Sequence, residues 1–312
     1  MTKVDTTIAI ERLNSSNVDG LITLFHAVHG RMVTADFFRN KYATGYAGVE
    51  YVGYIAYSNE QPVAFIGAIP CRLYDRGAIV LAAQLADGMT HPAYRNKGLF
   101  VSLVERTVEL CRQNKVRLLF GFPNQHSLPV FLNRLGWEVY GKMDHFSLPV
   151  TTLPLEKISQ KLPFLKNGYQ NYQQKILKRY SQDISATHEP WFPGQYPAVY
   201  RTSEYLQYKS RDTFFIAIKK AFVWLKINNG LLIGDILVSG NEIDTVMRIL
   251  TGIARKLGVD KISFHCSSGN PVHTLLAGKY PSTPSFPVIF KDLGSGMELE
   301  KIKFTYADMD IF

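Results

Sequence analysis

The chain has 312 residues, of which 46% are hydrophobic and 20% charged, so it holds enough apolar material for about two folded domains and extensive disorder is excluded. Its 35 Lys and Arg residues outnumber the 26 Asp and Glu residues, and the resulting net charge of +9 suits an anionic partner or cofactor. Three widely spaced cysteines exclude a disulfide framework, and without a signal-peptide core or an apolar run of about 18 residues we expect a cytoplasmic protein with no membrane span.

The first half of the chain alternates strand patterns with helix patterns. Apolar, β-branched and aromatic runs predict strands at residues 8–12, 51–57, 62–73, 77–90, 116–120 and 137–146. Capping residues and helical periodicity predict helices at residues 14–28, 35–42, from 99 to about 111, and 124–135. This order predicts one compact unit.

The second half repeats much of this order. Residues 155–180 are rich in Lys and Gln, and we expect a helical stretch interrupted at Pro163 and Gly168. Strands are then expected at residues 214–218, 222–227, 231–238, 261–265 and 286–290, and helices at 204–209, 242–257 and 271–277. We therefore expect domains at residues 1–148 and 184–312, joined by a helical bridge at residues 149–183.

The most informative stretch is a basic turn between a strand and a helix. The strand ends at His91-Pro92, the turn contains Arg95 and Lys97, and Gly98 precedes the helix. Backbone N–H groups at a helix start attract anions, and glycine lets a phosphate approach the backbone closely. The turn therefore predicts a phosphate site and a phosphorylated cofactor.

The turn Arg95-Asn96-Lys97-Gly98-Leu99-Phe100 resembles the acyl-CoA-binding signature of the GNAT superfamily of N-acetyltransferases, with Phe100 in place of a final small residue. Downstream, Asn124-x-x-Ser127 and the run from Phe131 to Trp137 resemble the next helix of that family. The resemblance covers roughly residues 50–141 and, through a degenerate second copy, extends loosely to the C-terminus. The tandem units also resemble enhanced-intracellular-survival acetyltransferases and, without the turn, FemAB-type aminoacyl transferases.

The resemblance implies an α/β (α+β) fold of two tandem units, each with a mixed, mostly antiparallel central sheet flanked by helices. It implies that the backbone N–H groups of six residues hold the pyrophosphate of acetyl-CoA, namely Arg95, Asn96, Lys97, Gly98, Leu99 and Phe100. Met89 and Thr90 would pair with the pantetheine arm as an added strand does, and Asn124 would bond to it with Ser127 nearby. The alternatives are a solvated basic turn and an ordinary helix cap at Asn124.

The second unit has Val238-Ser239-Gly240-Asn241 where the first unit has its basic turn, so only the first unit is expected to bind the cofactor. The family's usual base position falls on Gln84 and its usual acid position on Leu132, and neither side chain handles protons. Asp87 and the C-terminal carboxylate of Phe312 are the substitute catalytic candidates. A capping carboxylate and an inert docked tail are the alternatives, and direct attack by a neutral amine needs no residue base.

These observations predict a CoA-dependent N-acyltransferase that moves an acetyl group from acetyl-CoA to the primary amine of a small molecule by direct attack. No His, Cys or carboxylate cluster has metal spacing, so no metal is expected. The sequence contains no platform of aromatic and basic residues, so no nucleic-acid partner is expected. A non-catalytic CoA-binding protein of the same fold is the first alternative. A FemAB-like aminoacyl transferase is the second, favoured by the tandem units and opposed by the intact turn.

Overall fold

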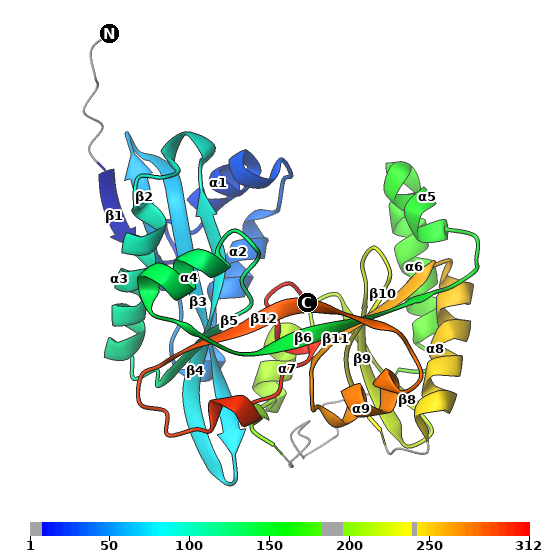
Figure 1. Ribbon diagram of the computed structural model, residues 1–312. Coiled ribbons are helices and arrows are strands. Elements are labelled where there is room, and N and C mark those ends of the chain that lie inside the picture. The colour runs from blue at the N-terminus through cyan, green and yellow to red at the C-terminus, as the bar shows by residue number, and fades with distance from the viewer. Residues whose placement is uncertain (1–7, 182–195, 239–241) are drawn as a thin grey trace. The chain divides into compact units, whose positions relative to one another are not determined.

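The computed structural model describes residues 8–181, 196–238 and 242–312, and the chain divides into two compact units (Figure 1). The first unit runs to Tyr140 and also contains Val288–Leu299, and the second contains Gly141–Pro287 and Glu300–Phe312. These limits differ from the boundaries expected from the sequence, because one late strand returns to the first unit and the helices of the expected bridge belong to the second.

The first unit is built on a mostly antiparallel sheet. Its strands follow the order β1 (Ile8–Arg12), β2 (Val52–Ser58), β3 (Gln61–Asp75), β4 (Ala78–Thr90), β5 (Leu118–Gly121) and the end of β12 (Ser282–Asp292). Every neighbouring pair is antiparallel except β4 and β5, which run parallel. A parallel pair needs a crossover, and α3 (Leu99–Gln113) supplies it.

Helices cover both faces of this sheet (Figure 1). Helix α3 and α4 (Leu128–Leu135) pack on one face, where Leu103, Val104 and Phe131 join one hydrophobic core. Helix α1 (Gly20–His29) contacts β3 and β4, and α2 (Ala35–Tyr42) contacts β3. The buried residues of α3 recur at helical spacing, which gives the helix one apolar face.

Two predicted helices of the first unit begin later than expected. Asn14 Oδ1 accepts hydrogen bonds from the N–H groups of Ser16 and Asn17, so the chain makes a turn there and α1 begins only at Gly20. Similarly, α4 begins at Leu128 rather than at Asn124. In both cases an Asn side chain bonds to the backbone just after it, which favours a turn over a helix.

The second unit also has one parallel pair in an antiparallel sheet. Its strands follow the order β6 (Glu138–Pro149), β11 (Lys261–Ser267), β10 (Leu231–Leu237), β9 (Ala221–Ile227) and β8 (Thr213–Ile218), with β10 and β11 parallel. Its helices are α5 (Leu155–Lys161), α6 (Lys166–Leu177), α7 (Ser203–Lys209), α8 (Ile243–Leu257) and α9 (Pro271–Ala277). Helices α6, α8 and α9 contribute to its core.

The stretch expected as a bridge is interrupted once rather than twice. A short 3-10 helix at Pro163–Leu165 separates α5 from α6, as the proline predicted. The predicted break at Gly168 is wrong, because α6 runs through it. Tyr169 and Tyr172 donate to the carbonyls of Leu257 and Lys256 at the end of α8, and these tertiary bonds hold α6 in place.

Candidate functional site

Strand β4 contains a β-bulge near its end. The register against β3 shifts by one residue between Ala86 and Met89, and Asp87, with φ of 54°, lies in this interval. Parallel pairing of β4 with β5 ends at Gln84, opposite Phe120. A bulge bends its strand and increases its twist, so β4 separates from β5 beyond this point. In the described part of the chain, the edge of β4 that faced β5 has no strand partner after Gln84.

Met89 and Thr90, the residues expected to contact a pantetheine arm, form the end of this separated strand. The Met89 side chain is buried and that of Thr90 is half-buried. Their backbone edge is therefore what a ligand meets, and an extended ligand adds to such an edge through main-chain hydrogen bonds.

The basic turn follows directly after Thr90, and its shape is set by backbone hydrogen bonds and backbone angles. A 3-10 turn at Pro92–Tyr94 is closed by the hydrogen bond from the Tyr94 N–H to the His91 carbonyl (2.8 Å). Asn96 and Gly98 then take left-handed φ values of 61° and 78°. A Cβ atom placed on Gly98 would meet no heavy atom within 4 Å, so the space above this residue is open.

The start of α3 presents unsatisfied backbone donors. The Ser102 N–H donates to the Gly98 carbonyl (3.1 Å) and is the first N–H of the helix with an acceptor among the described residues. No acidic side chain lies in the first turn. The N–H groups before Ser102 and the positive end of the helix dipole therefore form a site for an anion.

Two cations flank these donors, and both are exposed. Arg95 Nε donates to the Thr90 carbonyl (3.4 Å), which ties its side chain to the end of β4. Lys97 Nζ lies 4.7 Å from the centre of the Tyr94 ring, whose hydroxyl donates to Ser58 Oγ (3.0 Å). No pattern in the sequence indicated Ser58 or the ring contact. These contacts hold positive charge beside the helix start.

Phe100 occupies the position where the family signature has a small residue, and its ring points away from the turn into the core. A Cβ atom on Gly88 would lie 2.8 Å from the Phe100 ring, which also packs edge-on against Phe131 at 5.6 Å between ring centres. Only the backbone of Phe100 faces the anion site. The large side chain is therefore compatible with close approach of a ligand.

The side-chain oxygen of Asn124 caps the turn that follows it, and the side-chain NH₂ group stays available as a donor. Its Oδ1 accepts hydrogen bonds from the N–H groups of His126 (2.9 Å) and Ser127 (3.0 Å), so the capping interaction is present. Its Nδ2 has no acceptor among the residues described, and the side chain is exposed. Capping fixes the amide while leaving the NH₂ group able to donate to a ligand.

Asp87 is held by two side chains of α2. Its carboxylate accepts hydrogen bonds from Lys41 Nζ (2.8 Å) and from the Tyr42 hydroxyl (2.7 Å). The Tyr42 ring lies 2.3 Å from where a Cβ atom on Gly67 would stand, so only glycine fits opposite the bulge. We call Lys41 and Tyr42 the clamp on Asp87. The sequence did not reveal this clamp, because Lys41 and Tyr42 lie 46 and 45 residues before Asp87. In the sequence, the strand glycines Gly67 and Gly88 were the indication that a bulge or a close contact lies here.

We expect Asp87→Asn to lower the free energy of unfolding by about 1–3 kcal/mol, because it breaks a partly buried ion pair. Binding of acetyl-CoA, measured by calorimetry, should not change. Asp75→Asn is the matched control, since its carboxylate is equally buried but its partner Arg76 is exposed. A fall in kcat of about a hundredfold with unchanged donor affinity would assign Asp87 a catalytic role, whereas unchanged kcat would leave it a structural one.

The second unit repeats the bulge, but the described residues at the start of its long helix are acidic. Strand β10 stops pairing with β11 at Ile233 and has its register shift against β9 at Gly234, next to Asp235. Its long helix α8 begins with Glu242 at the cap and Asp244 in the first turn. Negative side chains there repel an anion. In the segment Val238-Ser239-Gly240-Asn241, which stands where the first unit has its basic turn, residues 239–241 lie outside the described residues.

The C-terminal segment occupies the place in the second unit where β10 leaves β11. Thr305 forms an isolated bridge to Cys266 of β11, and the Phe304 carbonyl accepts from the Ser267 N–H (2.9 Å). The Phe312 ring packs on Gly234, and an oxygen of the Phe312 C-terminal carboxylate accepts from Lys226 Nζ (2.9 Å). Phe312 is thus anchored within the second unit, and its proposed role as a base stays a prediction.

We expect Phe312→Ala to destabilise the protein by about 3 kcal/mol, because a buried ring leaves a cavity. Phe164→Ala, at an exposed site of the same unit, should have little effect on urea unfolding.

A Cβ atom on Gly234 would lie 2.4 Å from the Phe312 ring. Gly234→Ala should therefore destabilise the wild type but cost much less in the Phe312→Ala background, and equal costs in both would contradict the packing described here.

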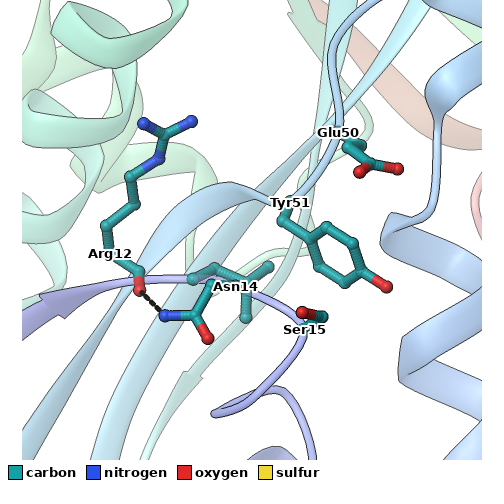
Figure 2. Close-up of a pocket in the computed structure, with 6 residues that line it drawn as sticks. Arg12, Asn14, Ser15, Glu50 and Tyr51 are labelled. Atoms are coloured by element: carbon teal, nitrogen blue, oxygen red, sulfur yellow. Dashed lines mark hydrogen bonds between the residues drawn. The ribbon is translucent and has the colours of Figure 1, made fainter.

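A shallow pocket of about 570 Å³ lies elsewhere on the first unit, between Arg12, Leu13, Asn14, Ser15, Glu50 and Tyr51 (Figure 2). Its residues lie at the end of β1 and immediately before β2 begins. Tyr94 contacts Ser58 at the other end of β2, so the pocket and the basic turn are separate. Among the described residues, no group of three His, Cys, Asp or Glu side chains is placed to hold a metal ion.

The fold and the site define a mixed α/β domain in which a bulged strand, a basic turn and a helix start form an anion site. Residues 9–140 match the family model of the acetyltransferase (GNAT) domain. No curated protein matches the chain.

Solved structures of similar fold carry acyltransferase descriptions. A GCN5-related N-acetyltransferase from Kribbella flavida aligns with a TM-score of 0.57 and 14% identity, over 92% of this chain and 72% of that one. A probable N-acyltransferase from Enterococcus faecalis V583 aligns with a TM-score of 0.60 and 13% identity, over 95% and 75%. A putative acetyltransferase from Pyrococcus horikoshii gives 0.55 and 11%, over 96% and 93%. At these identities the likeness shows the fold, a mostly antiparallel sheet flanked by helices.

Proposed function

We propose that the protein is an N-acetyltransferase that takes its acetyl group from acetyl-CoA and transfers it to a primary amine. The observation that carries the proposal is the start of α3, where backbone donors without acceptors among the described residues meet a left-handed Gly98 with open space above it. A diphosphate is the part of CoA that such a site suits. The GNAT match over residues 9–140 supports the same donor.

The rest of the donor extends from the turn along β4. Arg95 and Lys97 neutralise diphosphate charge, the edge at Met89 and Thr90 pairs with the pantetheine amides, and Asn124 Nδ2 donates to the same arm. These groups lie in one unit: Arg95 bonds to Thr90 at the separated end of β4, and Asn124 follows β5, the strand from which β4 separates. Together they would orient the thioester beside the bulge, which is how positioning lowers the barrier of a transfer between two bound reactants.

Transfer then proceeds by direct attack of a neutral amine on the thioester carbonyl. The amine nitrogen forms the new amide bond, the carbon–sulfur bond breaks, and the amine loses a proton while the CoA sulfur leaves as thiolate or gains one. Asp87 and solvent are the candidate proton acceptors.

A second function is favoured by the residues at the two positions where the family usually has its base and its acid. Gln84 is buried on β4 and Leu132 is half-buried on α4, and neither exchanges protons at neutral pH. A protein that binds CoA without turnover would have this combination. The FemAB-like alternative is opposed by the basic turn, which resembles the acyl-CoA-binding signature that such transferases generally lack.

The experiment that separates these functions measures binding and turnover on the same preparation. Calorimetry with acetyl-CoA tests the donor site, and release of free CoA thiol across a broad panel of primary amines tests transfer. Binding together with amine-dependent thiol release supports the transferase. Binding without release from any amine supports the non-catalytic protein, and absence of binding overturns both.

A further inference from the structure

Exposed apolar side chains are concentrated in one segment of the second unit. Of the twelve large hydrophobic side chains that are exposed among the described residues, seven belong to the segment from α5 to α6: Leu153, Leu155, Ile158, Leu162, Phe164, Leu165 and Tyr172. Phe164 is 78% exposed and Leu153 is 74% exposed, the highest values in the set. We call this segment, residues 153–179, the α5–α6 surface. Contiguous exposed apolar groups mark interaction sites.

The same segment is strongly basic. It holds six exposed cations, Lys157, Lys161, Lys166, Lys175, Lys178 and Arg179, and one acidic residue, Glu156, which is buried. Lys157 pairs with Asp260. Within the described ranges the other five cations form no ion pair. Apolar groups among unpaired cations favour an occupant that is both anionic and apolar.

The α5–α6 surface is held in place by its buried side. Glu156 accepts a hydrogen bond from the Gly230 N–H (3.0 Å), and Leu177 is fully buried in the core of the second unit. Tyr169 and Tyr172 bond to the end of α8, as described above. Figure 1 shows α5 and α6 at one end of this unit. The exposed apolar side chains are therefore presented on a fixed support.

We propose that the α5–α6 surface binds peripherally to an anionic phospholipid membrane. Phe164 and Leu153 enter the boundary between headgroups and acyl chains, and the lysines contact lipid phosphates. A combination of Lys with Phe and Leu is typical of helices that lie in a membrane interface. Each cation near such a surface contributes about 1 kcal/mol. None of the described helices is long and apolar enough to cross a bilayer.

Charge argues against a second copy of the chain as the occupant. A twofold contact brings the same patch of both copies together. Here it would place two sets of unpaired cations face to face, which is repulsive. An anionic lipid surface neutralises the same cations, so the charge pattern complements a membrane and opposes self-association.

The test is sedimentation of the full chain with vesicles. We expect it to sediment with vesicles that contain equal parts phosphatidylcholine and phosphatidylglycerol, to remain in solution with pure phosphatidylcholine, and to dissociate at high salt. Lys161→Gln combined with Lys166→Gln should weaken binding about thirtyfold, as the loss of two such contacts implies. Lys219→Gln with Lys220→Gln, which removes equal charge from another exposed site of the same unit, should bind like the wild type.

The apolar half of the surface is tested by Leu153→Ser combined with Phe164→Ser. This variant should lose binding, whereas Met32→Ser, at a 68% exposed site of the first unit, should keep it. Thermal unfolding checks that each variant is folded. No sedimentation of the wild type with anionic vesicles, or equal binding by both lysine pairs, overturns the proposal. Light scattering that shows a dimer lost in Leu153→Ser with Phe164→Ser would assign the surface to self-association instead.

Discussion

Gly98→Asp is expected to weaken acetyl-CoA binding at least thirtyfold, whereas Gly98→Asn should retain most of it. Gly98 has φ of 78°, and both Asn and Asp tolerate this left-handed backbone better than other side chains. A Cβ atom meets nothing there, so neither variant disturbs the packing of the protein. A carboxylate beside a diphosphate costs about 2 kcal/mol or more, even with substantial solvent screening.

Calorimetry on the two variants separates charge from shape, because Asn and Asp differ little in size. Arg106→Gln, at an exposed cation further along α3, serves as a control for the loss of general positive charge. Arg95→Gln should weaken binding more than Arg106→Gln does. Equal affinities for Gly98→Asp and Gly98→Asn would mean that the diphosphate is bound elsewhere.

Arg201→Met is expected to lower the free energy of unfolding by about 3–5 kcal/mol at neutral pH, since it leaves buried carboxylates without a counter-charge. Arg201 is only 3% exposed and forms ion pairs with Asp235 and, at 2.7 Å, with Asp308. It also donates to Thr305 Oγ1 (2.9 Å). The residue therefore joins β10 to the C-terminal segment.

The loss in Arg201→Met should grow as pH rises. Burial raises the pKa of Asp235, and the charge of Arg201 opposes that rise. Without Arg201 the folded-state pKa rises further, so the folded variant binds a proton more readily than the unfolded chain. Its stability then falls as pH increases through that pKa, and the deficit is smaller near about pH 5 than at neutral pH.

Arg76→Met is the matched control, because Arg76 also pairs with two carboxylates, Asp75 and Glu298, but is exposed. Its urea midpoint should stay close to that of the wild type at every pH. Trp224, whose ring lies 5.8 Å from the Arg201 guanidinium carbon, reports unfolding by fluorescence. A deficit in Arg201→Met that does not change with pH would contradict the titration argument.

Local patterns predicted most elements of the fold, because strand alternation and helix periodicity depend on neighbouring residues. The limits of β1, α2 and α9 are those expected. Elements with side chains that bond to nearby backbone were misplaced, as at Asn14. The return of β12 to the first unit was not predictable, because its pairing with β5 joins residues about 170 positions apart, such as Phe290 and Phe120.

The site was predictable where it is built from consecutive residues. The strand end, the turn and the helix start occupy one stretch, so their order alone predicted an anion site around Gly98. The clamp on Asp87 was not predictable, because Lys41 and Tyr42 come from a helix that precedes β2 and meet the bulge only in the folded unit. The packing of the Phe312 ring on Gly234 was not predictable either, because these residues meet only in the folded unit.

Both units place an aspartate at the bulge of the central strand and bind it to a cation from an earlier segment, Lys41 for Asp87 and Arg201 for Asp235. The second unit keeps this arrangement although its helix start is acidic and Phe312 packs on its bulge. The pairing of an aspartate with a cation at a bulge therefore occurs in both units, although only the first is expected to bind a donor. Any chemistry specific to the first unit must therefore depend on more than this pairing, which both units share.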